Sequence, residues 1–145
     1  MIKVRFPEPD FRIKKEGEKR YIFDTIRKMW LLLTEEEWVR QNFVAYLIRE
    51  LKYPSALIAL EKEIFLNELK KRFDILVYDK THQPWMMVEC KAPTVLLSDD
   101  VLQQVLRYNV SVPVKYLVIT NGEATVVWGK EESGLELQQQ MPVSS

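Results

Sequence analysis

The spacing of hydrophobic residues predicts an amphipathic helix over residues 34–51. Four apolar side chains recur there every four residues, so they would lie along one face of a helix. They are Val39, Phe43, Leu47 and Leu51. Thr34 and Glu37 have the spacing of a capping box, which marks the start of a helix. The segment from Lys52 to Ser55, which contains Pro54, is expected to end it.

Beyond this helix the apolar residues occur in short runs of strand length. Continuous apolar runs predict strands that are buried on both faces of a sheet. Asn121 and Gly122 predict a hairpin between the last two strands, because this dipeptide favours the backbone of tight turns. The predicted strands are Leu57–Phe65, Phe73–Tyr78, Trp85–Cys90, Lys115–Thr120 and Ala124–Trp128.

A second amphipathic helix is predicted between the third and fourth strands. Ser98 is its expected N-cap, and Asp99 and Asp100 follow where the helix dipole favours negative charge. The apolar positions of this helix are Val101, Leu102, Val105, Leu106 and Tyr108. The order helix, three strands, helix, two strands predicts an α/β sandwich, with a mixed sheet of about five strands flanked by helices.

The two ends of the chain are predicted to lie outside a folded unit of residues 34–130. Residues 1–20 are charged and contain proline, which predicts an extended arm, and residues 21–33 are expected to be partly helical. The tail of residues 131–145 is expected to be frayed. Trp38, Trp85 and Trp128 are expected in the core.

Composition excludes several classes of protein. The 145 residues suit one domain, and 21 basic against 21 acidic side chains exclude a polybasic binder. The charge is nevertheless uneven, because residues 1–115 carry 20 basic and 17 acidic side chains. Cys90 and His82 are the only residues of their kinds, which excludes a disulfide scaffold, a cysteine-based zinc site and a histidine cage. Without a signal-peptide pattern or an apolar run of about 20 residues, a cytoplasmic protein without membrane contact is expected.

Three polar side chains interrupt the predicted buried strands and are the candidates for chemistry. Asp74 lies in the second strand, and Glu89 and Lys91 end the third. Alternate residues of a strand share a face, so Glu89 and Lys91 would project together, with Cys90 opposite as a small core residue. If these two strands pair as a hairpin, Asp74 comes beside Glu89. Two neighbouring carboxylates favour a cation between them, and their hard oxygen atoms select Mg²⁺ or Mn²⁺.

These residues resemble the motif of the PD-(D/E)XK nuclease superfamily. The strings RFDILVYD and PWMMVECKAP, followed by Gln104 and Tyr108, are similar to the N-terminal nuclease domain of type I restriction enzyme R subunits. The similarity extends over residues 34–122, with Phe73 in place of the motif's proline. It implies a restriction-endonuclease-like three-layer sandwich. It also implies a Mg²⁺-dependent deoxyribonuclease, an enzyme of a restriction system that hydrolyses phosphodiester bonds.

The resemblance assigns roles to individual residues. Asp74 and Glu89 would bind the metal, and Lys91 would position the attacking water or steady the charge of the transition state. Gln104 and Tyr108, one helical turn apart, would support the site or contact DNA. The family's helix glutamate corresponds to Glu36, with Glu37 as the alternative.

The expected partners are DNA and other restriction subunits, among them a translocase on a separate chain. A homodimer or sequential cuts would be needed to cleave both strands. Phosphate contacts flanking the metal site are expected from basic residues, although those at 70–72 could equally form a solvated turn. These are Lys70, Lys71, Arg72, Arg40 and Arg107.

Other readings of the same residues stay open. Asp74 could be a structural acid paired with Arg72, and Glu89 with Lys91 could be an exposed ion pair that contributes little stability. The chain could then be a non-catalytic DNA- or protein-binding module that retains the fold. A scaffolding protein is a further alternative, and it would expose a large apolar patch over residues 21–33.

Overall fold

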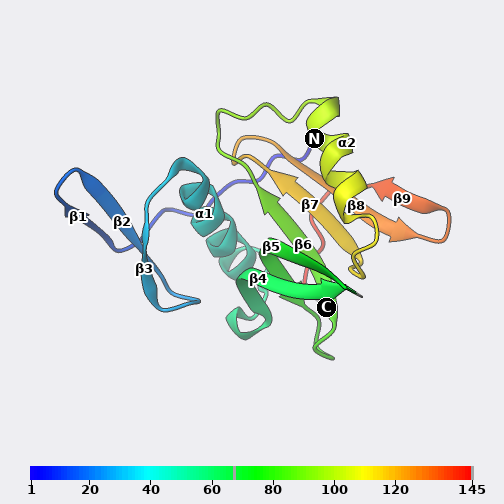
Figure 1. Ribbon diagram of the computed structural model, residues 1–145, viewed down its shortest axis with the longest axis horizontal. Helices are drawn as coiled ribbons and strands as arrows, with labels where there is room; N and C mark the ends of the chain where they lie inside the picture. Colours follow the sequence, from blue (N-terminus) through cyan, green and yellow to red (C-terminus); the bar gives the residue numbers. More distant parts are fainter. Residues whose placement is uncertain (67, 145) are drawn as a thin grey trace.

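The computed structural model describes residues 1–66 and 68–144 of the chain (Figure 1). Two sheets and two α-helices make up the fold. The strands are β1 (Ile13–Glu16), β2 (Lys19–Asp24), β3 (Met29–Leu32), β4 (Ile58–Leu66), β5 (Leu69–Tyr78), β6 (Pro84–Cys90), β7 (Tyr116–Thr120), β8 (Thr125–Glu131) and β9 (Gly134–Leu137). The helices are α1 (Glu35–Arg49), α2 (Asp99–Asn109) and a short 3-10 turn, η1 (Ser55–Leu57).

The main sheet contains six strands in the order β4-β5-β6-β7-β8-β9. Only β6 and β7 run parallel, with Val88 opposite Val118, and the segment that contains α2 connects them. All other neighbours are antiparallel, so the sheet is mixed. The predicted α/β architecture is therefore confirmed, and the sheet has one strand more than expected.

The two helices cover opposite faces of this sheet. Val118 of β7 belongs to the same core cluster as Phe43 and Leu47 of α1. Its neighbour Ile119 belongs to the cluster that contains Val105 of α2. Because successive residues of a strand point to opposite faces, α1 and α2 form separate layers on either side of the sheet.

Both predicted helices begin where their capping residues place them. The Thr34 hydroxyl accepts a hydrogen bond from the Glu37 backbone N–H at 3.0 Å, and Ser98 Oγ accepts one from Val101 at 3.4 Å. Val39, Phe43 and Leu47 are almost completely buried against the sheet. The period of the apolar stripe therefore gave the buried face of α1 correctly.

The N-terminal residues form a separate three-stranded antiparallel sheet beside α1, in the order β1-β2-β3 (Figure 1). The prediction of partial helix over residues 21–33 was wrong. Asp24 is fully buried, and its Oδ1 accepts from the backbone N–H groups of Ile26 and Arg27, which closes a turn between β2 and β3. The preceding arm is also anchored, because Ile2 bridges to Thr125 of β8.

The C-terminal segment is ordered against the core, so the prediction of a frayed tail was wrong for residues 131–144. β9 extends the sheet through its pairing with β8, as in Leu137 opposite Trp128. Met141 is only 6% exposed and packs in the α1 core cluster. The Tyr53 hydroxyl donates to the Pro142 carbonyl at 2.7 Å, which fixes the segment further.

The hairpin turn and the environments of Cys90 and His82 agree with their predictions. Asn121 and Gly122 lie in the connection of the β7–β8 hairpin, where Gly122 has φ of 91° and Asn121 Oδ1 caps two backbone N–H groups. Cys90 is buried and His82 is exposed, as expected. Within the described residues, neither α1 nor α2 has the length and apolar content to cross a bilayer.

Candidate functional site

The candidate site lies where β5 and β6 part. Their pairing ends at Ile75 opposite Val88, and the next residues on each side are Asp74 and Glu89. Asp74 Oδ2 accepts a hydrogen bond from the Cys90 backbone N–H at 2.8 Å. The Asp74 carboxylate therefore reaches across the gap to the end of β6, and the predicted hairpin that brings it beside Glu89 is confirmed.

Glu89 and Lys91 project to the same side of β6, as alternation along the strand predicts. Lys91 Nζ lies 3.1 Å from Glu89 Oε2, and both side chains are about one-third exposed or less. They line one wall of a pocket of about 360 Å³, and Gln104 and Tyr108 of α2 line the other. The structure thus brings four of the predicted site residues around one hollow.

The guanidinium of Arg40 occupies a cluster of carboxylates on the α1 side of Asp74. Arg40 Nη2 lies 3.2 Å from Asp74 Oδ1, 3.1 Å from Glu36 and 2.8 Å from Glu61. Arg40 Nη1 lies 2.5 Å from Glu37 Oε1. One buried cation therefore contacts four acidic side chains from α1, β4 and β5.

Burial and neighbouring charges set the protonation of this cluster. Burial raises the pKa of Asp74 to about 6, against the lowering effects of the Cys90 N–H and Arg40, while Glu36 and Glu89 raise it further. Burial lowers the pKa of Arg40, but Glu37, Asp74 and Glu61 outweigh it, so the pKa is raised and the guanidinium stays charged. With a pKa of about 6, Asp74 is mostly ionised at neutral pH and faces the charged guanidinium of Arg40.

Acidic groups outnumber basic groups in the ion-paired network that surrounds Asp74. Its cations are Arg27, Arg40 and Arg72, and its carboxylates are Asp24, Glu36, Glu37, Glu61 and Asp74. When all of these groups are ionised, the network carries two uncompensated negative charges. Such an excess favours binding of a cation, since like charges at short range destabilise one another.

The two candidate helix glutamates differ in their surroundings. Glu36 is exposed at the N-terminal end of α1, and it reaches the site through Arg40. Glu37 is buried and accepts hydrogen bonds from Arg40 and from Gln41 Nε2 at 3.0 Å. Its backbone is capped by Thr34, but its carboxylate is used in the ion cluster, not in the reciprocal bond of a capping box.

The basic residues proposed for phosphate contacts are not equivalent. Lys71 is 3% exposed and donates to the Tyr108 carbonyl, with its Nζ 4.4 Å from the centroid of the Tyr108 ring. Like Arg40, it faces protein groups and does not present its charge to solvent. Lys70 and Arg72 are exposed and pair with Glu63 and Glu61, and Arg107 is exposed on α2.

Glu61 is the residue of this site that sequence reasoning missed. Its carboxylate contacts both Arg40 and Arg72, at 2.8 and 2.6 Å. Its backbone has φ of 52°, the left-handed region that non-glycine residues rarely adopt. The available signal was an acidic residue within the apolar run of β4, but nothing in the sequence indicated that the strand turns this side chain toward the site.

The donor set can be compared with the needs of a divalent ion. In the described part of the chain, no three acidic, histidine or cysteine side chains converge as a ready metal cage. Mg²⁺ commonly uses one or two carboxylates and completes its shell with water and phosphate oxygens. Asp74 and Glu89, on adjacent strands where the β5–β6 pairing ends, supply the two carboxylates that this arrangement needs.

Comparison with known proteins gives one family match. Residues 35–142 match the family model described as type I restriction enzyme R protein N terminus. The matched segment runs from the first residue of α1 through β9 to the anchored tail, and it includes every proposed site residue, whereas Asp24 and Arg27 of the ion-paired network precede it. A search of curated proteins gave no match.

Proposed function

The chain belongs to the family of type I restriction enzyme R protein N termini, and from this premise we propose that it is a divalent-metal-dependent DNA endonuclease domain. The observation that carries the proposal is the position of Asp74 and Glu89 on adjacent strands where β5 and β6 part, with Lys91 ion-paired to Glu89. Paired carboxylates beside a lysine supply what metal-assisted hydrolysis of a phosphodiester bond requires.

Asp74 and Glu89 are the proposed ligands of Mg²⁺ or Mn²⁺. The metal would supply a Lewis acid for the phosphate and lower the pKa of a bound water. The Cys90 N–H donates to the Asp74 carboxylate at 2.8 Å. The backbone of β6, which carries Glu89, therefore positions Asp74, the other proposed ligand. The excess of negative charge in the surrounding network supports occupancy by a divalent cation.

Lys91 is the proposed catalytic residue that acts on the attacking water and on the phosphate group of the substrate. Its ammonium group lies on the same face as Glu89 and lines the pocket, where it can orient a water molecule or offset charge on a phosphate oxygen. Gln104 and Tyr108 line the facing wall and would contact the substrate or ordered water. These contacts come from α2, on the opposite side of the pocket from β6.

Arg40 is proposed as a positioning residue. It holds Asp74 Oδ1 at 3.2 Å while Cys90 holds Oδ2, so both oxygen atoms of the carboxylate are fixed in direction. Glu36, Glu37 and Glu61 in turn hold the guanidinium. Of the two helix glutamates, Glu36 is proposed to approach the substrate, because its side chain is exposed and that of Glu37 is buried.

The family relates the chain to restriction enzymes, and the proposed partners follow from that context. DNA is the proposed substrate, and other restriction subunits, including a translocase, are the proposed protein partners. A non-catalytic module that retained this fold would bind DNA or protein without requiring a metal at Asp74 and Glu89.

Calorimetric titration with Mn²⁺ tests the metal site separately from activity. We expect saturable heat with the full chain and loss of that heat in Asp74→Asn and in Glu89→Gln. Glu131→Gln is the matched control for Glu89, because Glu131 pairs with Lys115 at the same 3.1 Å on another part of the sheet. Absence of binding in the unmodified chain would contradict the proposed metal site and favour the non-catalytic alternative.

A further inference from the structure

A groove lies between the N-terminal sheet and the start of α1. It consists of two hollows, of about 490 and 380 Å³, that share Ile13 and Arg20 as lining residues. The outer hollow lies over β1 and β2, and the inner hollow reaches α1 and the loop after β6. We call the two together the N-terminal groove.

The outer half of the groove is basic. Lys14, Lys15 and Arg20 line it, with Glu18 as the one acidic residue among its lining side chains. Lys15 and Arg20 are exposed, whereas Lys14 pairs with Glu16 at 3.2 Å. Residues 1–33 carry nine basic and five acidic side chains, while the chain as a whole is neutral. This segment, which precedes the family match, therefore carries four more basic than acidic side chains, and some of its basic residues line the groove.

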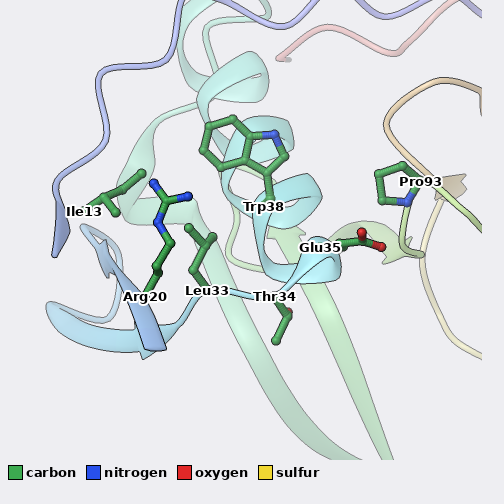
Figure 2. A pocket seen from close by; sticks show the side chains of 7 residues that line it. All are labelled: Ile13, Arg20, Leu33, Thr34, Glu35, Trp38 and Pro93. Atoms are coloured by element: carbon green, nitrogen blue, oxygen red, sulfur yellow. The ribbon is translucent and has the colours of Figure 1, made fainter. Parts of the chain in front are cut away.

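The inner half combines apolar and aromatic lining residues with the polar Arg20, Thr34 and Glu35. Trp38 is half-buried there together with Leu33, and the edge-on ring of Phe11 holds it at a centroid distance of 5.5 Å. Figure 2 shows Arg20 extending from β2 toward Trp38, and Glu35 pointing toward Pro93. A carboxylate at this end disfavours a phosphate, so the inner half suits an uncharged ring that stacks on an aromatic side chain.

The inner end of the groove adjoins the candidate nuclease site. Glu35, which lines the groove, is followed directly by Glu36 of the Arg40 cluster. Pro93, on the other wall, lies two residues beyond Lys91. A strand that followed the groove from its basic to its aromatic end would arrive at Glu35 and Pro93, which are close in the chain to Glu36 and Lys91 of the candidate site.

We propose that the N-terminal groove binds single-stranded DNA, with phosphates at Lys15 and Arg20 and one unpaired base at Trp38. This inference rests on the proposed function, since it supplies the route by which a strand reaches the nuclease site. Proteins that hold single strands combine a basic track with aromatic side chains that stack on bases. A base in a duplex is already stacked and paired, so the Trp38 hollow selects an unpaired one.

The test measures binding without cleavage. Fluorescence anisotropy of a labelled oligonucleotide is recorded with the full chain in EDTA, so the result does not depend on the metal site. Trp38→Leu removes the aromatic ring but keeps an apolar side chain, and Trp38→Phe keeps a ring. We expect Trp38→Leu to weaken binding of single-stranded DNA by about 5- to 150-fold, the range of one base–aromatic stack, and Trp38→Phe to weaken it less.

The charged half is tested by the double substitution Lys15→Gln with Arg20→Gln. Loss of two phosphate contacts should lower the slope of log affinity against log salt by about 1.4 for a single strand. Lys52→Gln with Lys80→Gln removes the same charge from exposed positions outside the groove and should leave the slope near that of the unmodified chain.

An abasic oligonucleotide of the same length separates stacking from charge. Trp38→Leu and Trp38→Phe should bind it equally, because it offers no base, while the Lys15 and Arg20 substitutions should still weaken it. Equal affinity of the unmodified chain for duplex and single strand, or an unchanged affinity of Trp38→Leu for the base-containing strand, would overturn the proposal. If binding in EDTA follows these expectations but the chain does not cleave DNA in Mg²⁺, the nuclease function is refuted. Binding of single-stranded DNA by the N-terminal groove is then still supported.

Discussion

Asp74 on β5 accepts a hydrogen bond from the backbone N–H of Cys90 at the end of β6, across the point where the two strands part. This bond fixes a carboxylate in a gap where strand pairing would otherwise continue. The same carboxylate is buried enough for its pKa to rise to about 6. A buried acid that is held in direction but destabilised in its ionised form is a feature of functional sites.

Replacing Asp74 by Asn should change stability in a pH-dependent way. The folded chain holds the Asp74 proton up to about pH 6, whereas the unfolded chain releases it near pH 4, so ionisation lowers the free energy of unfolding between these values. Asn does not ionise and keeps an oxygen to accept from Cys90. Relative to the unmodified chain, Asp74→Asn should therefore gain stability as pH rises from 4 to 6, by at most about 3 kcal/mol.

Urea denaturation at several pH values measures this difference. Groups that do not interact with Asp74 titrate alike in both chains and cancel in the comparison. A stability difference that stays constant with pH, or that moves against Asn as pH rises, would contradict the raised pKa of Asp74.

Arg40 should be far more important for stability than an ordinary surface arginine. It is 6% exposed and contacts four carboxylates, so Arg40→Gln leaves their charges uncompensated and should lower the free energy of unfolding by about 3–5 kcal/mol. Arg49→Gln is the control, because Arg49 is exposed and pairs with the exposed Asp10; it should cost about 1 kcal/mol or less.

Added Mn²⁺ should restore part of the stability lost in Arg40→Gln if the carboxylates can take a cation in place of the guanidinium. Thermal unfolding of both arginine variants, with and without the ion, gives the comparison. Similar losses in the two variants would show that the Arg40 cluster does not depend on its buried cation.

Because the C-terminal segment packs on the core, shortening a buried side chain in it should lower the free energy of unfolding. Met141 is buried in the core cluster of α1, so Met141→Ala should lower the free energy of unfolding by about 2–5 kcal/mol. Val143 is 66% exposed, and Val143→Ala should have little effect. Chemical denaturation distinguishes them, and equal stabilities would mean that the tail does not pack on the core in solution.

The sequence predicted the main sheet, both helices and the meeting of Asp74 with Glu89, because these depend on local period and on a short hairpin. Val39, Phe43 and Leu47 lie on one face of α1, so burying them requires that this face packs against the sheet. Asp74 came beside Glu89 because a hairpin between neighbouring strands fixes the register over a short distance.

The missed features depend on polar turn contacts and on contacts between distant segments. The turn between β2 and β3 is closed by the buried Asp24, and its pairing with Arg27 is invisible in a pattern of apolar residues. Met141 and Pro142 are ordered only because Tyr53 and the α1 core lie nearby. Arg40 was expected to face DNA, but acids from β4 and β5 surround it once α1 packs on the sheet.

The central claim is that Lys91 serves metal-dependent cleavage of DNA together with Asp74 and Glu89. Its control is Lys115→Ala, because Lys115 pairs with Glu131 at 3.1 Å and is exposed to a similar degree as Lys91. Both substitutions should leave the chain folded, since partly exposed ion pairs contribute about 1 kcal/mol or less.

The most direct measurement is cleavage of plasmid and single-stranded DNA by the full chain in Mg²⁺ or Mn²⁺, with EDTA as the blank. We predict cleavage by the unmodified chain and by Lys115→Ala, and a loss of at least about 100-fold in Lys91→Ala. Absence of cleavage in the folded, metal-loaded chain, or equal cleavage by Lys91→Ala, would contradict the proposed nuclease function.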